Sequence, residues 1–170
     1  RYWRDWSSDV CSSDLDRTGH QADFAESSAV RAVLPQASHM KVAVLKETFP
    51  GERRVAIVPG VIPALAKAGV DVLVESGAGT GTGYTDEDYR VAGARIVSRD
   101  EAFSADCVVA VRACGACGDS WCQDLDKLRP GLVVIGLCDP LSAPDACRQA
   151  AEKGVTLFSL ELVPRITRAQ

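Results

Sequence analysis

The sequence predicts an α/β fold with three layers, in which helices cover a parallel, flavodoxin-like (Rossmann-like) sheet of about five strands. Two observations support this class: short apolar runs of strand length recur along the chain, and helical segments separate them. Strands that alternate with helices pair in parallel through right-handed crossovers. The runs expected to form strands are residues 41–45, 70–74, 107–111, 132–137 and 155–160, with a minor extended piece at 95–97.

Residues that start and stop helices bound the segments between these strands. The segments expected to be helical are residues 60–68, 85–92 and 142–153. Pro63 lies in the first turn of the first helix, where its missing N–H costs little. Thr85 and Asp88 have the spacing of a capping box at the start of the second helix. Ser142 is expected to cap the third helix, and Gly154 is expected to end it.

A cysteine-rich segment, residues 113–124, is small, polar and aperiodic, which predicts a surface loop. Cys114 and Cys117 form a Cys-x-x-Cys pair, and Cys122 follows them. A redox pair or a partial metal site is one interpretation, but no fourth ligand stands at a usual spacing. An incidental cysteine-rich loop is favoured, and no metal is expected. The odd number of cysteines and the lack of a secretion signal indicate reduced thiols in a cytosol.

The first 39 residues differ in character from the rest of the chain. Residues 5–15 resemble the direct translation of a common sequencing-library adapter, so residues 1–39 are interpreted as a non-native or disordered leader. Met40, the only methionine, is taken as the natural start of one domain, residues 40–170, which is expected to be incomplete at its carboxyl end. Both histidines precede Met40, which excludes a histidine-based acid–base or metal site from the domain.

Charge and hydropathy exclude two classes of partner. The formal net charge is −4, so the chain lacks the excess of basic residues that is typical of nucleic-acid-binding domains. No apolar run approaches the ~20 residues that are needed to span a bilayer, so no direct membrane insertion of this segment is expected.

Two loops are candidates for ligand contacts. The glycine-rich run at residues 77–83 fails the dinucleotide-binding fingerprint, because no register places glycine at its first, third and sixth positions. A flexible turn is favoured there, and a contribution to a cleft wall is the alternative. Arg53 and Arg54 follow a Pro-Gly turn soon after the first strand. An arginine there can hold a carboxylate or phosphate through two hydrogen bonds, or pair with Glu47 or Glu52 in a solvated turn.

Seven short motifs occur in an order that resembles the N-terminal domain shared by alanine dehydrogenase and the α subunit of proton-translocating NAD(P) transhydrogenase. The resemblance covers residues 40–170, and the motifs are specific jointly rather than singly. They are Lys46-Glu47, Gly51-Glu-Arg-Arg-Val-Ala56, Glu75-Ser-Gly-Ala-Gly79, Ala92-Gly-Ala94, Ala105-Asp106, Arg129-Pro-Gly131 and Val163-Pro-Arg-Ile-Thr-Arg-Ala-Gln170.

In alanine dehydrogenase, an Arg, a Lys and a His hold the carboxylate and keto group of the substrate. On this resemblance the Arg falls on Arg54, the Lys on Arg112, and the His on or beside Asp139. An aspartate with a reference pKa of ~4 cannot replace an imidazole that exchanges a proton near neutrality. An Arg in place of the Lys keeps the charge but has no usable deprotonated form. The three residues are therefore expected as equivalents of the substrate pocket, and alanine dehydrogenation is disfavoured.

Residues 165–170 resemble the start of the Arg-Gln-Asp loop of transhydrogenase, which lies beside the nicotinamide end of bound NAD(H). The resemblance implies that Arg165, Ile166, Thr167 and Gln170 bind this cofactor. Arg165 would hold polar groups or phosphates on the nicotinamide side, and Gln170 would orient the nicotinamide end. The Asp of the loop is expected three residues after Gln170. None of these residues is expected to exchange protons with the substrate, so no catalytic residue is assigned.

The resemblance implies a fragment of the NAD(H)-binding α subunit of an enzyme that is Re/Si-specific and proton-translocating. Hydride moves between NAD(H) on this subunit and NADP(H) on a partner β subunit, and the transfer is coupled to proton movement through a membrane domain. The expected assembly is a homodimer, located in the cytoplasm and held peripherally at the inner membrane through the partner. The fragment alone is expected to be inactive, because the family's second domain carries the pyrophosphate fingerprint.

Three other functions remain as alternatives. The first is an alanine dehydrogenase-like NAD-dependent oxidoreductase with altered pocket residues. The second is a regulatory or scaffold module without catalysis. The third is a thiol or metal module built on Cys114, Cys117 and Cys122.

Overall fold

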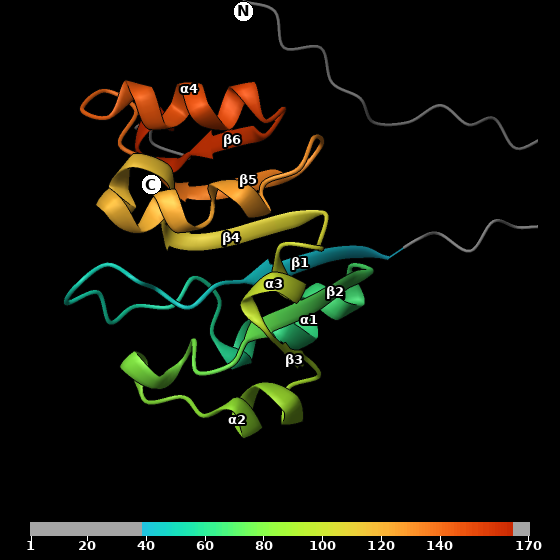
Figure 1. The fold of residues 1–170 in the computed structure, drawn as a ribbon. Coiled ribbons are helices and arrows are strands. Elements are labelled where there is room, and N and C mark those ends of the chain that lie inside the picture. Colours follow the sequence, from blue (N-terminus) through green and yellow to red (C-terminus); the bar gives the residue numbers. More distant parts are fainter. Residues whose placement is uncertain (1–38, 165–170) are drawn as a thin grey trace, which may run out of the picture. The chain divides into compact units, whose positions relative to one another are not determined.

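The computed structural model describes residues 39–164, except for the side chains of residues 119–122. Within this range six parallel strands form one sheet in the order β3-β2-β1-β4-β5-β6 (Figure 1). The strands are β1 (Met40–Val44), β2 (Val70–Glu75), β3 (Arg95–Val97), β4 (Cys107–Arg112), β5 (Val133–Leu137) and β6 (Thr156–Ser159). The predicted leader, apart from His39, and the predicted cofactor loop at residues 165–170 lie outside the described residues.

The sheet confirms the predicted α/β class and all five main strands. Without the short edge strand β3, the strands follow the flavodoxin order, and β3 extends this order to that of a Rossmann fold. The direction of strand addition reverses between β1 and β4, which are hydrogen-bonded neighbours. The carboxyl ends of these two strands therefore flank a topological switch point, where open α/β sheets bind ligands.

The first two predicted helices are present. α1 (Ile62–Lys67) contacts β2, and a 3₁₀ turn at Pro59–Val61 precedes it. α2 (Asp86–Val91) begins after Thr85, and its capping box is confirmed. The Asp88 N–H donates to the Thr85 hydroxyl (3.2 Å), and the Asp88 carboxylate accepts from the Thr85 N–H (2.7 Å). No helix within the described residues has the length and apolar character that crossing a membrane requires.

The third predicted helix begins later than expected. α4 runs from Pro144 to Glu152, and its N-cap residue is Ala143, without a side-chain cap. The prediction that Ser142 caps this helix is wrong, because Pro144 presets the helical φ at the first position and has no N–H to be capped. Gly154 follows the helix with a φ of +72°, in agreement with its predicted role as the helix stop.

The prediction of a surface loop at residues 113–124 is also wrong. A 3₁₀ segment, Cys114–Gln123, follows β4, with a break at Gly118, where the backbone is not helical, and Cys114 is fully buried. Its small residues allow this packing, because a Cβ added at Gly115 would clash with the Cβ of Ala143. The aperiodic, polar composition suggested exposure, whereas the small side chains bring the backbone directly against the start of α4.

Apolar clusters lie on both faces of the sheet. One face packs against α3 (Arg99–Ala102), the Cys114–Gln123 segment and α4, and the other packs against α1 and α2. In Figure 1, α1 lies by β2, and α4 lies by β6 at the opposite edge of the sheet. α3 was not predicted, because four residues are too few to show a helical period.

Among the described residues, the helices that cover the second face are α1 and α2, which lie over β1 to β3. On β4, β5 and β6 the same face carries partly exposed apolar side chains, which we call the open half-face: Val109, Val111, Ile135, Leu137 and Phe158. Phe158 is the register partner of Ile135 and is 55% exposed. This apolar surface ends at the carboxyl edge of the sheet, beside the switch point.

Candidate functional site

Arg54 and Arg112 meet at one carboxylate, that of Glu52. Arg54 lies in the loop after β1, and Arg112 ends β4. The Glu52 carboxylate accepts hydrogen bonds from Arg54 Nε (2.7 Å) and Nη2 (2.6 Å) and from Arg112 Nε (3.1 Å). It also accepts from the backbone N–H groups of Arg53 (3.1 Å) and Arg54 (3.0 Å). The ion pair with Glu52, one of the two that the sequence allowed, therefore joins two predicted pocket residues.

This network is strongly charged but internally paired. The Glu52 side chain is only 6% exposed, and hydrogen bonds from Arg54 hold the pKa of Glu52 well below its ordinary value. Glu52 in turn raises the pKa of Arg54. The Arg54 side chain is 60% exposed, so part of its guanidinium group faces solvent. The site thus offers a positioned guanidinium group whose charge is partly balanced.

Two side chains of the loop after β1, Glu47 and Phe49, also contact the end of β4. The Glu47 carboxylate accepts from the N–H groups of Val111 (2.6 Å) and Arg112 (3.1 Å). Burial raises the pKa of Glu47. The guanidinium carbon of Arg112 lies 4.2 Å from the ring centroid of Phe49, a cation–π contact. These contacts fix the position of Arg112 relative to the loop that carries Arg54.

The glycine-rich run at residues 77–83 packs against the same loop. A Cβ added at Gly81 would lie 2.8 Å from the carbonyl oxygen of Arg53, so this approach requires glycine. The N–H of Gly77 donates to the Asp86 carboxylate (2.8 Å), and this bond lowers the pKa of Asp86. Thr82 lines the cleft described next. The run therefore contributes to a cleft wall, which was the alternative to a merely flexible turn.

An apolar cleft of about 600 Å³ lies beside the arginine pair. Its lining includes the open half-face residues Val109, Val111, Ile135 and Leu137, together with polar groups of Arg54 and Thr82. Ligand sites in proteins have volumes of about 300–1,000 Å³ and combine an apolar lining with a few placed polar groups. The size and composition of this cleft fit that description.

Tyr89 holds the loop between β1 and α1, which lines the cleft, in place. Its side chain is fully buried, and its hydroxyl donates to the carbonyl oxygen of Ile57 (2.9 Å), a residue that lines the cleft. Burial raises the pKa of Tyr89 to about 12, so the hydroxyl remains a donor at physiological pH. Tyr89 therefore ties α2 to the loop that carries Arg54.

Asp139, the third predicted pocket residue, lies at the same edge after β5. Arg112 and Leu137 are register partners, so Asp139 follows closely beyond the end of β4. Its φ is +50°, and the Asp139 N–H and the Cys138 N–H (2.8 Å) both donate to the Glu161 carboxylate. Within residues 39–164, no hydrogen bond or ion pair joins the Asp139 side chain to either arginine. The structure brings the two arginines together and leaves Asp139 as a neighbour at the edge.

Sequence reasoning missed Phe49, Tyr89 and Glu161. Glu161 had a usable signal, because it is an isolated carboxylate among apolar residues at the end of a strand. Phe49 and Tyr89 had none, because their contacts depend on how a long loop folds back over two strands. The predicted cofactor residues Arg165, Ile166, Thr167 and Gln170 lie outside the described residues, and their role stays a prediction.

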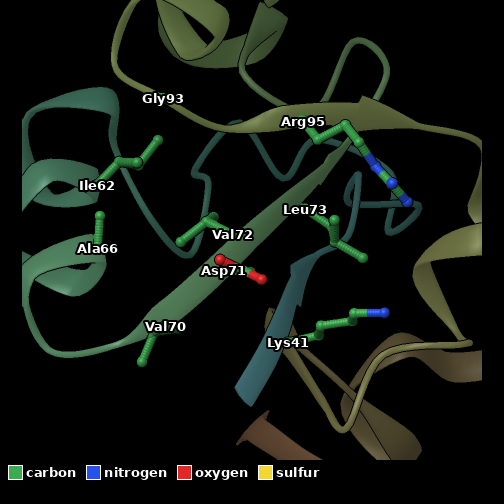
Figure 2. Close-up of a pocket in the computed structure, with 9 residues that line it drawn as sticks. All are labelled: Lys41, Ile62, Ala66, Val70, Asp71, Val72, Leu73, Gly93 and Arg95. Atoms are coloured by element: carbon green, nitrogen blue, oxygen red, sulfur yellow. The ribbon is translucent and has the colours of Figure 1, made fainter. Parts of the chain in front are cut away.

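A second, smaller hollow of about 190 Å³ lies near the opposite ends of the strands. Figure 2 shows Ile62 and Ala66 of α1 on one side of it and Lys41 and Arg95 on the other. Lys41 and its register partner Asp71 stand near the starts of β1 and β2. Because ligands of open α/β sheets bind at the carboxyl ends, the cleft beside Arg54 is the stronger candidate site.

Comparisons with known proteins relate the chain to two groups of enzymes. NAD(P) transhydrogenase subunit alpha of Cereibacter sphaeroides is 35% identical over 133 residues, which is 77% of this chain and 24% of that protein. Alanine dehydrogenase 1 of Staphylococcus aureus is 31% identical over 131 residues, which is 77% of this chain and 34% of that protein. The structure of transhydrogenase from Sinorhizobium meliloti has a TM-score of 0.70 and 39% identity, and the match covers 76% of this chain and 37% of that one.

The chain spans only about a quarter to a third of the length of the curated relatives that it matches. The sequence profile described as "Alanine dehydrogenase/PNT, N-terminal domain" matches residues 43–170, a range that includes Arg54, Arg112 and Asp139. The match covers most of the chain and agrees with the parallel sheet of the structure. The chain therefore belongs to the family of the alanine dehydrogenase/PNT N-terminal domain.

Proposed function

We propose that this chain is a fragment of the NAD(H)-binding α subunit of a proton-translocating, Re/Si-specific NAD(P) transhydrogenase. The sequence comparisons support this choice, because the transhydrogenase relatives are 35% and 39% identical and the alanine dehydrogenase relative is 31% identical. The chemistry of the cleft is the stronger argument.

The observation that carries the proposal is that Arg54 is the one ionisable side chain among the described residues that line the cleft. Arg54 and Arg112 are permanently charged, and residues 40–170 contain no histidine. Glu47 has a raised pKa, but both of its oxygens accept backbone N–H groups of β4. Oxidation of an amino acid to a keto acid requires proton transfer, whereas hydride transfer between two nicotinamides requires none.

The cleft fits the nicotinamide end of NAD(H). Its apolar floor suits one face of a flat ring, and Arg54 at its rim can donate hydrogen bonds to a carboxamide or phosphate. The Thr82 hydroxyl donates to the carbonyl oxygen of Gly79, so its oxygen is left to accept a hydrogen bond from a carboxamide N–H. Bound NAD(H) supplies the hydride. The chain's own residues hold the ring in place, exclude water on the apolar side and balance charge through Glu52. Arg165, Ile166, Thr167 and Gln170 would complete the contacts.

The proposal extends to the assembly of the whole enzyme. NADP(H) binds to a partner β subunit, which also provides the membrane domain and the proton path. The α subunit is a homodimer in the cytoplasm, held peripherally at the inner membrane through this partner. The proposal rests on the transhydrogenase relatives, such as the one from Cereibacter sphaeroides, whose name designates an α subunit.

Binding of NADH tests this proposal. We expect residues 40–170 alone to bind NADH weaker than the full-length subunit by a factor of about 100 or more, and to be inactive, because a one-sided cleft buries little of the ligand. In the full-length subunit, Arg54→Ala should weaken binding in isothermal titration calorimetry. Arg53→Ala is the matched control, because its side chain makes no contact with Glu52 among the described residues. Tight, stoichiometric binding by residues 40–170, or equal effects of the two substitutions, would contradict the proposal.

A further inference from the structure

Two cysteine sulfurs face each other between β4 and α4. Cys114 Sγ lies 3.7 Å from Cys147 Sγ. Cys114 begins the 3₁₀ segment Cys114–Gln123, and Cys147 lies on the second turn of α4. Cys114 is fully buried, and Cys147 is partly exposed. The pair therefore combines one protected thiol with one that solvent reaches.

The Cys-x-x-Cys spacing pointed to a different pair. Cys117 Sγ donates to the carbonyl oxygen of Arg112 (2.9 Å), so this thiol is directed at the backbone that ends β4. Cys138 Sγ donates to the carbonyl oxygen of Gly136 (3.6 Å). Within the described residues, Cys114 and Cys147 are the one pair of sulfurs in hydrogen-bonding contact.

The backbones around the pair are already close. A Cβ added at Gly115 would clash with the Cβ of Ala143 and would lie 2.9 Å from the carbonyl oxygen of Cys138. The 3₁₀ segment thus packs directly on the residues before α4. Because an S–S bond is about 2.05 Å long, disulfide formation requires the two sulfurs to move about 1.7 Å closer than they lie here.

We propose that Cys114 and Cys147 are a redox-active pair that forms a reversible intrachain disulfide when a peroxide is present. The peroxide first oxidises the Cys147 thiol to a sulfenic acid and releases one water. The Cys114 sulfur then attacks the Cys147 sulfur, forms the S–S bond and releases a second water. Two thiols thus lose two protons and two electrons in total, and the peroxide O–O bond is reduced. A dithiol reductant then reduces the disulfide back to two thiols and is itself oxidised to a disulfide.

The order of these steps follows from burial. Burial raises the pKa of Cys114 to about 12, so Cys114 is a poor first target for an oxidant. Contact with Cys147 compensates for this low reactivity in the second step, because the two sulfurs are held together. The bond would tie the β4–β5 crossover to α4, and it would leave the thiols of Cys117 and Cys138 free.

Peptide mapping of the full 170-residue chain tests the proposal. After treatment with hydrogen peroxide and blocking of free thiols, we expect tryptic peptides 113–127 and 128–148 to be joined, with the bond at Cys114 and Cys147 by fragment-ion assignment. The joined species should lack two hydrogen atoms and should disappear after treatment with dithiothreitol. Oxidation should also raise the thermal midpoint by roughly 5 °C or more, because it cross-links the unfolded chain.

Substitutions separate this pair from the alternatives. Cys147→Ser, at a partly exposed position, should abolish the cross-link and the rise in thermal midpoint while the chain still folds. Cys117→Ser and Cys138→Ser are the matched controls and should retain both. A bond between Cys114 and Cys117, a cross-link that persists in Cys147→Ser, or thiols at both positions that stay reduced under peroxide would each overturn the proposal.

Discussion

Replacing Tyr89 by alanine is expected to lower the free energy of unfolding by about 3–5 kcal/mol, the range for removing a large buried aromatic side chain. Tyr89 lies on α2 and is fully buried in the apolar cluster between α1, α2 and the sheet. Its ring stands edge-on to that of Tyr84, with the ring centroids 6.3 Å apart. The substitution leaves a cavity and also frees the carbonyl oxygen of Ile57. The measurement is chemical denaturation at equilibrium, followed by circular dichroism.

Two variants separate the ring from the hydroxyl of Tyr89. Tyr89→Phe keeps the ring and should cost only about 1 kcal/mol, the net contribution of one hydrogen bond. Tyr84→Ala is the matched control, because Tyr84 is 37% exposed and should cost clearly less than Tyr89→Ala. Equal losses for Tyr84→Ala and Tyr89→Ala would show that Tyr89 does not anchor the cleft loop.

Replacing Glu52 by alanine is expected to lower the free energy of unfolding by about 2 kcal/mol, because one buried carboxylate accepts hydrogen bonds from two arginines. The loss is smaller than for a fully buried ion pair, since the side chains of Arg54 and Arg112 are 60% and 33% exposed. In the full-length subunit the same change should weaken NADH binding, because Arg54 is no longer positioned. Glu87→Ala is the control, because Glu87 makes only an exposed pair with Arg90.

The pH dependence of the Glu52 effect has a defined sign. The folded-state pKa of Glu52 is lowered, so its contribution to stability is fully present above the ordinary pKa of about 4.3 and is lost as the pH falls through the folded value. The difference in unfolding free energy between wild type and Glu52→Ala should therefore be constant from about pH 7 to pH 5 and should shrink only in stronger acid. A difference that disappears already near neutral pH would show that Arg54 and Arg112 do not hold the carboxylate.

The sequence predicted those parts of the fold that depend on local signals. The capping box of Thr85 and Asp88 involves residues within one turn, so their spacing alone identifies it. The apolar strands were visible as runs, because strands of a parallel sheet are largely covered on both faces. The prediction that Ser142 caps the third helix failed because Pro144 has the stronger effect on where α4 begins.

The candidate site was only partly predictable, since it depends on contacts between distant segments. Arg54 and its pairing with Glu52 were accessible, because the two residues lie close in sequence. The approach of Arg112 to the same carboxylate follows from the reversal of strand order at β1 and β4, which no single motif encodes. The burial of Cys114 and its contact with Cys147 likewise arise from packing between a 3₁₀ segment and a helix.

Hydride transfer by the full-length subunit tests the central claim most directly. The subunit is mixed with the proposed NADP(H)-binding β subunit, and reduction of an NADP analogue by NADH is followed by absorbance. The account predicts transhydrogenation, and it predicts no oxidation of NADH with pyruvate and ammonium, because the described cleft residues include no proton-exchanging group. Oxidation of NADH with pyruvate and ammonium, without any transhydrogenation, would contradict the account and would instead establish an alanine dehydrogenase.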